Sequence, residues 1–240
     1  MAQLLRCVWC GEDLTRQLSW RFILGLAAQQ VICEICQGKL IPITGELCLT
    51  CGRPLSKLKP EYIHDHYCSD CIRWGNSEFG DVLESNKSFY EYNDFLKDIL
   101  ALYKFRGDVE AGRVFSAIFR EEIEKSYGYV DGVIPIPSSE ERLYERGFNQ
   151  CEVWIEGTEF LEDQILCRIN HEEKQSKKSR EKRIKRTEDM FQISPNATIR
   201  GKAFLLIDDL YTTGTTLHYA AKTLKHAGAS HVCSLTLCRS

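Results

Sequence analysis

The sequence predicts an α/β protein in which a parallel sheet with crossover helices follows a small, cysteine-rich metal-binding segment. Two observations support this prediction. Eight of the 12 cysteines in the 240-residue chain lie within the first 71 residues, all in CxxC pairs. The remainder alternates strand-like and helix-like segments, which is typical of parallel sheets. We expect residues 1–75 to form a metal-held domain and residues 76–240 to form the α/β domain.

The CxxC pairs are expected to bind metal rather than to form disulfides. The first residues show neither the basic start nor the apolar core of a secretory signal. The longest apolar stretch, residues 22–28, is too short to span a bilayer. We therefore expect a cytoplasmic protein without a membrane span, in which free thiols are available as metal ligands.

The spacing of the pairs favours two structural zinc sites. Each pair places two sulfurs on one tight turn, and two pairs complete a tetrahedral four-cysteine site. Pairing in sequence order is favoured, because the last two pairs alone have zinc-ribbon spacing. An interleaved pairing, a redox role and ligation by His64 or His66 are less favoured alternatives. The expected ligands are Cys7, Cys10, Cys33 and Cys36 in the first site and Cys48, Cys51, Cys68 and Cys71 in the second.

The rest of the chain is expected to alternate strands with helices. Residues 93–105 and 109–125 carry apolar side chains at helical spacing, and the glycine at position 107 separates them. The continuous apolar run 203–208, AFLLID, is typical of a central parallel strand that is buried on both faces. Other expected elements are strands ending near residue 92 and over 132–137, 164–169 and 231–237, helices over about 149–160 and 215–227, and a polar loop over 170–187.

The charge is unevenly distributed, although the net charge of the chain is only −3. Residues 81–173 carry a net charge of −11, whereas residues 174–186 carry +7. The overall composition therefore argues against a generally basic nucleic-acid-binding protein, and it singles out one strongly cationic segment.

One segment combines the features of an anion-binding loop. The apolar strand delivers two adjacent carboxylates, Asp208 and Asp209, and a threonine-rich loop with one glycine then leads into a helix. Amides at a helix start, together with threonine hydroxyls, favour a bound phosphate. The carboxylates would repel that phosphate and are better suited to sugar hydroxyls or to Mg²⁺. The GxxxxGK[ST] pattern of a Walker loop is absent from this segment.

Residues 205–216, LLIDDLYTTGTT, resemble the 5-phosphoribosyl-1-pyrophosphate (PRPP) motif of type I phosphoribosyltransferases. The resemblance implies their fold, with Asp208 and Asp209 as the catalytic acidic pair that contacts the ribose hydroxyls. It implies a 5′-phosphate site formed by Thr212, Thr213, Gly214, Thr215 and Thr216. Some base-salvage members carry an aspartate where Thr212 stands, and no aromatic base pocket is evident here. Transfer to a free purine or pyrimidine is therefore not supported.

Nearly the whole chain resembles the ComF (ComFC) family, which is associated with DNA uptake in natural competence. The resemblance rests on the CxxC pairs, KFRGD at 104–108, IPIPSS at 134–139, ERGFNQ at 145–150 and the PRPP motif. It implies PRPP with Mg²⁺ as ligand. It also implies single-stranded DNA and a helicase-like ATPase of the ComFA type as partners. Because zinc ribbons often serve as protein-docking surfaces, residues 1–75 are the expected protein contact.

Phosphoribosyl transfer also requires groups that neutralise the leaving pyrophosphate. The candidates for this task are Lys104, Arg106, Arg142 and Arg146. Pro137 and Ser138 follow a predicted strand and are candidates for a loop that exposes backbone amides to pyrophosphate. The cationic segment is expected to act either as a lid over pyrophosphate or as an arm on the DNA backbone, and a solvated charged loop is the alternative. Its candidate residues are Lys174, Lys177, Lys178, Arg180, Lys182 and Arg183.

Three functions are compatible with these features. The first is a DNA-uptake factor that uses a phosphoribosyltransferase fold as a scaffold or PRPP sensor. The second is an active phosphoribosyltransferase with an unknown acceptor. The third is a zinc-stabilised adaptor with a vestigial pocket. The sequence leaves open whether catalysis occurs.

Overall fold

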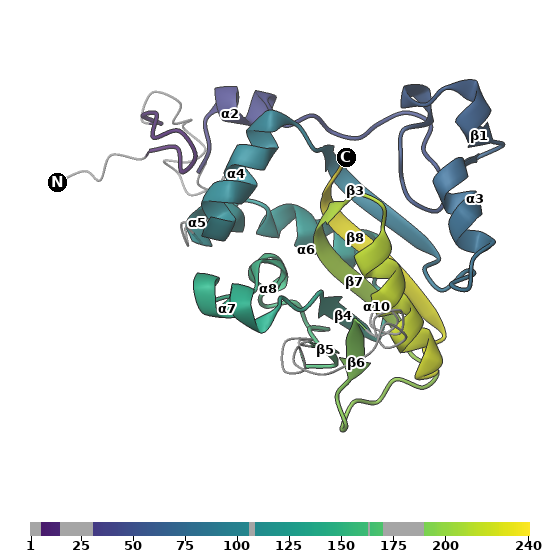
Figure 1. The fold of residues 1–240 in the computed structure, drawn as a ribbon. Coiled ribbons are helices and arrows are strands. Elements are labelled where there is room, and N and C mark those ends of the chain that lie inside the picture. The colour runs from purple at the N-terminus through teal and green to yellow at the C-terminus, as the bar shows by residue number, and fades with distance from the viewer. Residues whose placement is uncertain (1–5, 15–30, 106–108, 163, 170–189) are drawn as a thin grey trace, which may run out of the picture.

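A four-stranded, all-parallel sheet forms the centre of the computed structural model, which describes residues 6–14, 31–105, 109–162, 164–169 and 190–240 (Figure 1). The strand order is β3 (Ser85–Glu91), β8 (His231–Arg239), β7 (Ala203–Tyr211) and β4 (Gly132–Pro135). The apolar run that predicts a central strand lies in β7, which pairs on both sides. The predicted parallel α/β architecture is confirmed.

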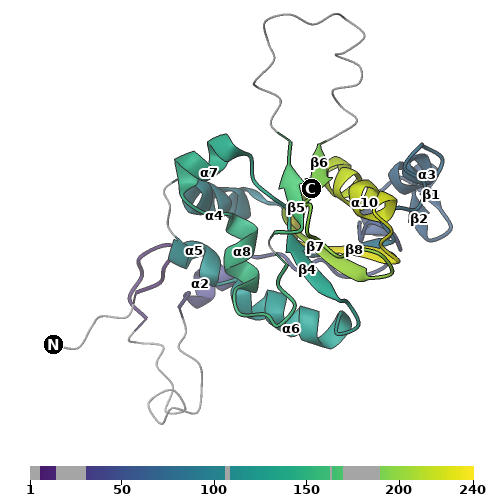
Figure 2. The ribbon, with the colours of Figure 1, turned by 90° about the horizontal axis from the view of Figure 1, so that it is seen from below.

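Helices cover both faces of the sheet (Figure 2). Along β7, successive side chains point to opposite faces. Phe204 and Leu206 pack into one core with α10 (Thr215–His226). Leu205 and Ile207 pack into the other core. The helices that bury this second face are α4 (Asp94–Phe105), α5 (Val109–Arg113), α6 (Ser116–Ser126) and α8 (Gln150–Ile155).

The prediction of a single helix over residues 109–125 is wrong, because the structure has two separate helices there, α5 and α6. The break lies beside Gly112, whose carbonyl accepts a hydrogen bond from Trp154 Nε1 at 3.0 Å. A Cβ at position 112 would lie 2.3 Å from the ring of Tyr103, so only glycine allows this close packing. These contacts come from distant parts of the chain, and the local apolar spacing does not reveal them.

Three further elements differ from the prediction. The helix expected over 149–160 ends at Ile155, and Gly157 follows with a φ of 81°. Helix α7 (Glu140–Arg146) was not expected, because its apolar residues Leu143 and Tyr144 are exposed and give no amphipathic pattern. Strand β5 (Leu166–Arg168) pairs antiparallel with β6 (Phe191–Ile193), outside the main sheet.

The N-terminal segment packs on both cores. Its elements are α2 (Glu34–Gly38), the hairpin strands β1 (Ile63–His64) and β2 (Tyr67–Cys68), and α3 (Ser69–Gly75). Helix α2 lies on the side of α5, and α3 lies on the side of α10 (Figure 2). Accordingly, Cys7, Cys33 and Cys36 belong to the core that contains α4 and α5, and the last four cysteines belong to the core that contains α10. Within the described residues, no helix is long and apolar enough to cross a membrane.

Candidate functional site

Two groups of four cysteines have the geometry of metal sites. Cys7, Cys10, Cys33 and Cys36 form one group, and Cys48, Cys51, Cys68 and Cys71 form the other. This is the predicted pairing in sequence order. His64 and His66 are exposed and lie outside both groups.

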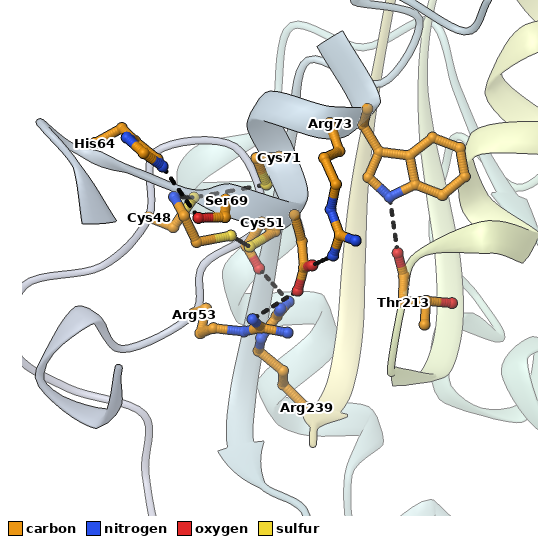
Figure 3. A network of polar contacts seen from close by, with 12 residues as sticks. Cys48, Cys51, Arg53, His64, Ser69, Cys71, Arg73, Thr213 and Arg239 are labelled. Carbon is orange, nitrogen blue, oxygen red and sulfur yellow. Dashed lines mark hydrogen bonds and ion pairs between the residues drawn. The ribbon is translucent and has the colours of Figure 1, made fainter. Parts of the chain in front are cut away.

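The sulfur distances fit zinc. Cys48 Sγ lies 3.6 Å from Cys71 Sγ, and Cys51 Sγ lies 3.6 Å from Cys68 Sγ (Figure 3). Four Zn–S bonds of about 2.3 Å in a tetrahedron separate the sulfurs by about 3.8 Å. Both groups are thus consistent with structural zinc sites, each with four protein ligands.

The predicted phosphate loop connects β7 to α10. Gly214 ends the loop with a φ of 79°, and a Cβ there would lie 2.3 Å from Tyr211 Oη. The position therefore requires glycine both for its backbone conformation and for lack of space. Thr212, Thr213 and Thr215 are exposed, and the hydroxyls of Thr213 and Thr215 lie 2.8 Å apart.

The N-terminus of α10 has no side-chain cap from its N-cap residue, and its nearest side-chain acceptor is Thr213 Oγ1, 3.5 Å from Thr215 N. Its cap residue, Gly214, has no side chain to cap the helix, and the intrahelical bonds begin where His218 N–H donates to Gly214 O at 2.9 Å. The amides of the first turn have no intrahelical acceptors and carry the positive end of the helix dipole. Together with the threonine hydroxyls, they form a cradle of donors suited to a phosphate.

The acidic pair lies within the last part of β7, and its two members have different surroundings. Asp209 forms an ion pair with Lys104 from α4. Asp208 is partly buried, and its Oδ1 accepts a hydrogen bond from Asp209 N–H at 2.9 Å. Burial, reinforced by the negative charge of Asp209, raises the pKa of Asp208 to about 7. The free carboxylate is thus costly to hold, and a cation or a hydroxyl donor would stabilise it.

Cationic side chains from separate elements surround the pair. Arg146 of α7 donates from Nη1 to Gln150 Oε1 at 2.8 Å, and Gln150 Nε2 donates to Asp209 Oδ2 at 3.4 Å. Burial lowers the pKa of the Arg146 guanidinium, and the positive charge of Arg142 adds to this effect. Burial and Arg142 also lower the pKa of Arg168 on β5. This clustering of positive charge favours an anionic ligand beside the acidic pair.

The structure brings together some of the predicted pyrophosphate residues. Lys104 pairs with Asp209, Arg146 reaches Asp209 through Gln150, and Arg142 is exposed but close enough for its charge to act on Arg146 and Arg168. Pro137 and Ser138 lie between β4 and α7, where Ser139 caps the helix by accepting a hydrogen bond from Arg142 N–H. The other candidates lie outside the described residues: Arg106, Lys174, Lys177, Lys178, Arg180, Lys182 and Arg183.

Three side chains near the site were not predicted as site residues. Gln150 lies in the ERGFNQ segment, which therefore contributes to the site as well as to the family resemblance. Arg168 is the last residue of the short strand β5, and its neighbours in sequence form no site motif. Trp74, from the cysteine-rich segment, donates from Nε1 to Thr213 O at 2.9 Å. No local sequence pattern connects Trp74 to a loop 139 positions away.

Family models match both parts of the chain. The phosphoribosyl transferase domain matches residues 163–240, and the double zinc ribbon domain matches residues 5–72. Among solved structures, hypoxanthine phosphoribosyltransferase from Trypanosoma cruzi is 11% identical with a TM-score of 0.34. The match covers 57% of this chain and 69% of that one. This last similarity is too low to support an argument about function.

Two curated relatives are similar over almost the entire chain. Competence protein ComFC of Bacillus subtilis (strain 168) is 40% identical, and the match covers 98% of this chain and 95% of that protein. Competence protein ComFC of Streptococcus pneumoniae (strain ATCC BAA-255 / R6) is 34% identical, with coverage of 98% and 100%. The chain therefore belongs to the ComFC family of competence proteins and has a phosphoribosyltransferase-like domain after its double zinc ribbon.

Proposed function

We propose that this competence protein binds PRPP with Mg²⁺ at the end of β7 and uses that site in the import of single-stranded DNA. One observation carries the PRPP part of the proposal. A chain of contacts joins cations of two helices to Asp209. Arg146 of α7 reaches Asp209 through Gln150, and Lys104 of α4 pairs with Asp209 directly. The threonine loop follows the same pair directly, so anion-binding groups lie on both sides of it.

Each part of PRPP has matching groups in this arrangement. The loop amides and Thr212, Thr213, Thr215 and Thr216 suit the 5′-phosphate, and Asp208 and Asp209 suit the ribose hydroxyls. Lys104, Arg142, Arg146 and Arg168 suit the pyrophosphate. Pro137 and Ser138 follow the end of β4. Ser138 remains a candidate donor to pyrophosphate through its backbone N–H, whereas Pro137 has no N–H and would only shape this turn.

The carboxylates also fit Mg²⁺, which prefers oxygen ligands and binds through one or two carboxylates together with substrate phosphates. Among the described residues Asp208 forms no ion pair, so it is the primary candidate ligand. Bound Mg²⁺ would neutralise charge on the pyrophosphate. Asp208, with its raised pKa, would regain a stable negative charge next to the cation.

We assign a separate role to each of the two proposed domains. Residues 1–75 form the double zinc ribbon and residues 76–240 the phosphoribosyltransferase-like domain. The ribbon exposes Leu49, Tyr62 and Ile72, which supports a role in docking a protein partner such as the ComFA-type ATPase. The cationic segment 174–186 is the proposed contact for single-stranded DNA.

Calorimetry with PRPP and Mg²⁺ tests the central proposal. The intact protein is expected to bind, and Asp208→Ala with Asp209→Ala is expected to weaken binding at least about 100-fold, because two charged hydrogen-bonding groups are lost. Glu140→Ala with Glu141→Ala removes an adjacent exposed acidic pair from α7 and is the matched control. Absence of PRPP binding by the intact protein would refute the proposal and leave the zinc-stabilised adaptor.

An active transferase is the second candidate, because the threonine loop, the acidic pair and the cationic side chains together offer groups suited to every part of PRPP. PRPP consumption with a panel of acceptors separates it from a sensor. A sensor binds PRPP without consuming it, whereas an enzyme releases pyrophosphate only when the correct acceptor is present.

A further inference from the structure

The second zinc ribbon directly contacts the phosphate loop. Trp74 Nε1 donates to the backbone carbonyl of Thr213 at 2.9 Å, and this is the dashed bond that ends on Thr213 in Figure 3. The Trp74 indole also stacks on His218 of α10, with ring centroids 3.9 Å apart and planes 11° apart. One side chain of the ribbon thus touches both the loop and the first turns of the following helix.

His218 holds the next carbonyl of the loop. It is buried, and its Nδ1 lies 2.9 Å from Gly214 O, so this nitrogen carries the proton and donates. Burial beneath Trp74 and the edge of Phe79 keeps the pKa of His218 below its usual value. Two consecutive carbonyls, those of Thr213 and Gly214, are therefore each held by a ring N–H.

These two bonds determine where the loop amides point. A trans peptide is planar, and its C=O and the following N–H point in opposite directions. Holding Thr213 O therefore orients the N–H of Gly214, and holding Gly214 O orients the N–H of Thr215. No cis peptide interrupts this relation in the described chain. Both amides belong to the cradle of donors at the start of α10.

The position of Trp74 depends on the second cysteine group. Helix α3 has seven residues, too few to be stable in isolation. It begins directly after Cys68, and Cys71 lies one turn before Trp74. A metal held by Cys68 and Cys71 would therefore fix where this short helix lies and, with it, the position of the Trp74 indole.

The other half of the same cysteine group is anchored to the sheet. Asn86 N–H of β3 donates to Thr50 O at 2.6 Å, and Arg239 Nη1 of β8 donates to Cys51 O at 2.8 Å (Figure 3). A metal bound by all four cysteines would link this anchored turn to the helix that carries Trp74. The ribbon would then act as a brace between the sheet and the phosphate loop.

We propose that Trp74 is a positioning residue for the phosphate loop, and that metal in the second cysteine group is required for the loop to bind the 5′-phosphate of a phosphorylated sugar at full affinity. This inference rests on the proposed function. It assigns the second ribbon a role in ligand binding in addition to holding its own fold.

Trp74→Phe tests the inference, because it keeps an aromatic ring and removes the N–H donor. The probes are ribose 5-phosphate, which the loop should bind, and Mg²⁺-pyrophosphate, which the cationic side chains should bind. Affinity for ribose 5-phosphate is expected to fall about 3- to 10-fold, the effect of one hydrogen bond. Affinity for pyrophosphate is expected to stay unchanged, which distinguishes loop positioning from general damage to the fold.

The chain offers a matched control in its first ribbon. Trp9 Nε1 likewise donates to a backbone carbonyl, that of Ala111, at 3.0 Å, but this bond lies in the core on the other face of the sheet from α10. Trp9→Phe is expected to leave the affinity for ribose 5-phosphate unchanged. Metal dependence is tested in the same way with Cys48→Ser against Cys10→Ser. Each is expected to lose one zinc per chain, and only Cys48→Ser should weaken ribose 5-phosphate binding.

The outcomes separate this inference from the proposed function. If Trp74→Phe binds ribose 5-phosphate as tightly as the intact protein, or loses both probes equally, the positioning role is wrong while PRPP binding stands. If Cys48→Ser binds ribose 5-phosphate normally, the metal requirement is wrong. If the intact protein binds neither PRPP nor ribose 5-phosphate, the proposed function fails, and this inference fails with it.

Discussion

Asp208→Asn should stabilise the ligand-free protein while removing ligand binding. The side chain is partly buried beside a second carboxylate, and these surroundings raise the pKa of Asp208 to about 7 from its usual 3.8. Asparagine keeps the shape and can still accept the hydrogen bond from Asp209 N–H, but it carries no charge. The substitution therefore removes a negative charge that destabilises the folded protein when no ligand is bound.

The size and sign of the effect follow from the pKa. The pKa of Asp208 is about three units higher in the folded state than in the unfolded state, and at a pH above 7 this difference lowers the free energy of unfolding by at most about 4 kcal/mol. Screening by water at this partly exposed group reduces the expected gain to about 1–3 kcal/mol. Because the folded state binds the proton more tightly than the unfolded state, Asp208 lowers the stability of the protein progressively as the pH rises from about 4 to about 7. The gain from Asp208→Asn is thus largest at pH 8 and smallest near pH 4.5.

Thermal unfolding of the zinc-loaded protein at pH 8 and at pH 6, where the zinc sites stay occupied, measures this difference. For a chain of this size, the expected gain corresponds to a rise in melting temperature of roughly 2–12 °C at pH 8. Asp209→Asn is the contrasting control. It leaves Lys104 without its ion-pair partner and is expected to destabilise the protein. The reasoning is refuted if Asp208→Asn destabilises the protein at pH 8, or if its effect does not depend on pH.

Two further predictions concern the loop and the cationic segment. Gly214→Ala should abolish PRPP binding in calorimetry, because the added Cβ would lie 2.3 Å from Tyr211 Oη. Gly157 has a similar φ, but a Cβ there would meet no atom within 4 Å, so Gly157→Ala should leave the affinity for PRPP unchanged. Equal binding by the two variants would contradict the loop assignment. Replacing Lys177, Lys178, Arg180 and Arg183 with alanine should reduce the salt dependence of single-stranded DNA binding by about three in the log–log slope. A slope equal to that of the intact protein would exclude the segment as the DNA contact.

The parts of the fold that the sequence predicts well are those with a strong local cause. The run AFLLID is buried on both faces because it lies in the sheet centre, and that burial requires an unbroken apolar pattern. The cysteine grouping is likewise local, since pairs that are neighbours in sequence lie in the same four-cysteine group. Errors in the predicted helix boundaries arise where contacts with distant residues override the local pattern. One example is Gly112, whose carbonyl accepts a hydrogen bond from Trp154 Nε1.

The candidate site divides in the same way. Its phosphate loop is contiguous, so the order of strand, acidic pair, threonines and helix can be recognised without a structure. Its cationic side is assembled from α4, α7 and β5, and Arg168 was not predicted because nothing near it in sequence marks it as a site residue.

The sequence alone determined which chemical groups lie close together along the chain: eight thiols in CxxC pairs, an adjacent acidic pair and a threonine-rich loop before a helix. These features need only neighbouring residues, whose relative positions the local backbone sets. Only the tertiary structure decided which groups meet across the chain. It joined Lys104 to Asp209, and it placed Trp74 of the second ribbon against Thr213. Such contacts depend on how the elements pack, and packing is a property of the whole chain.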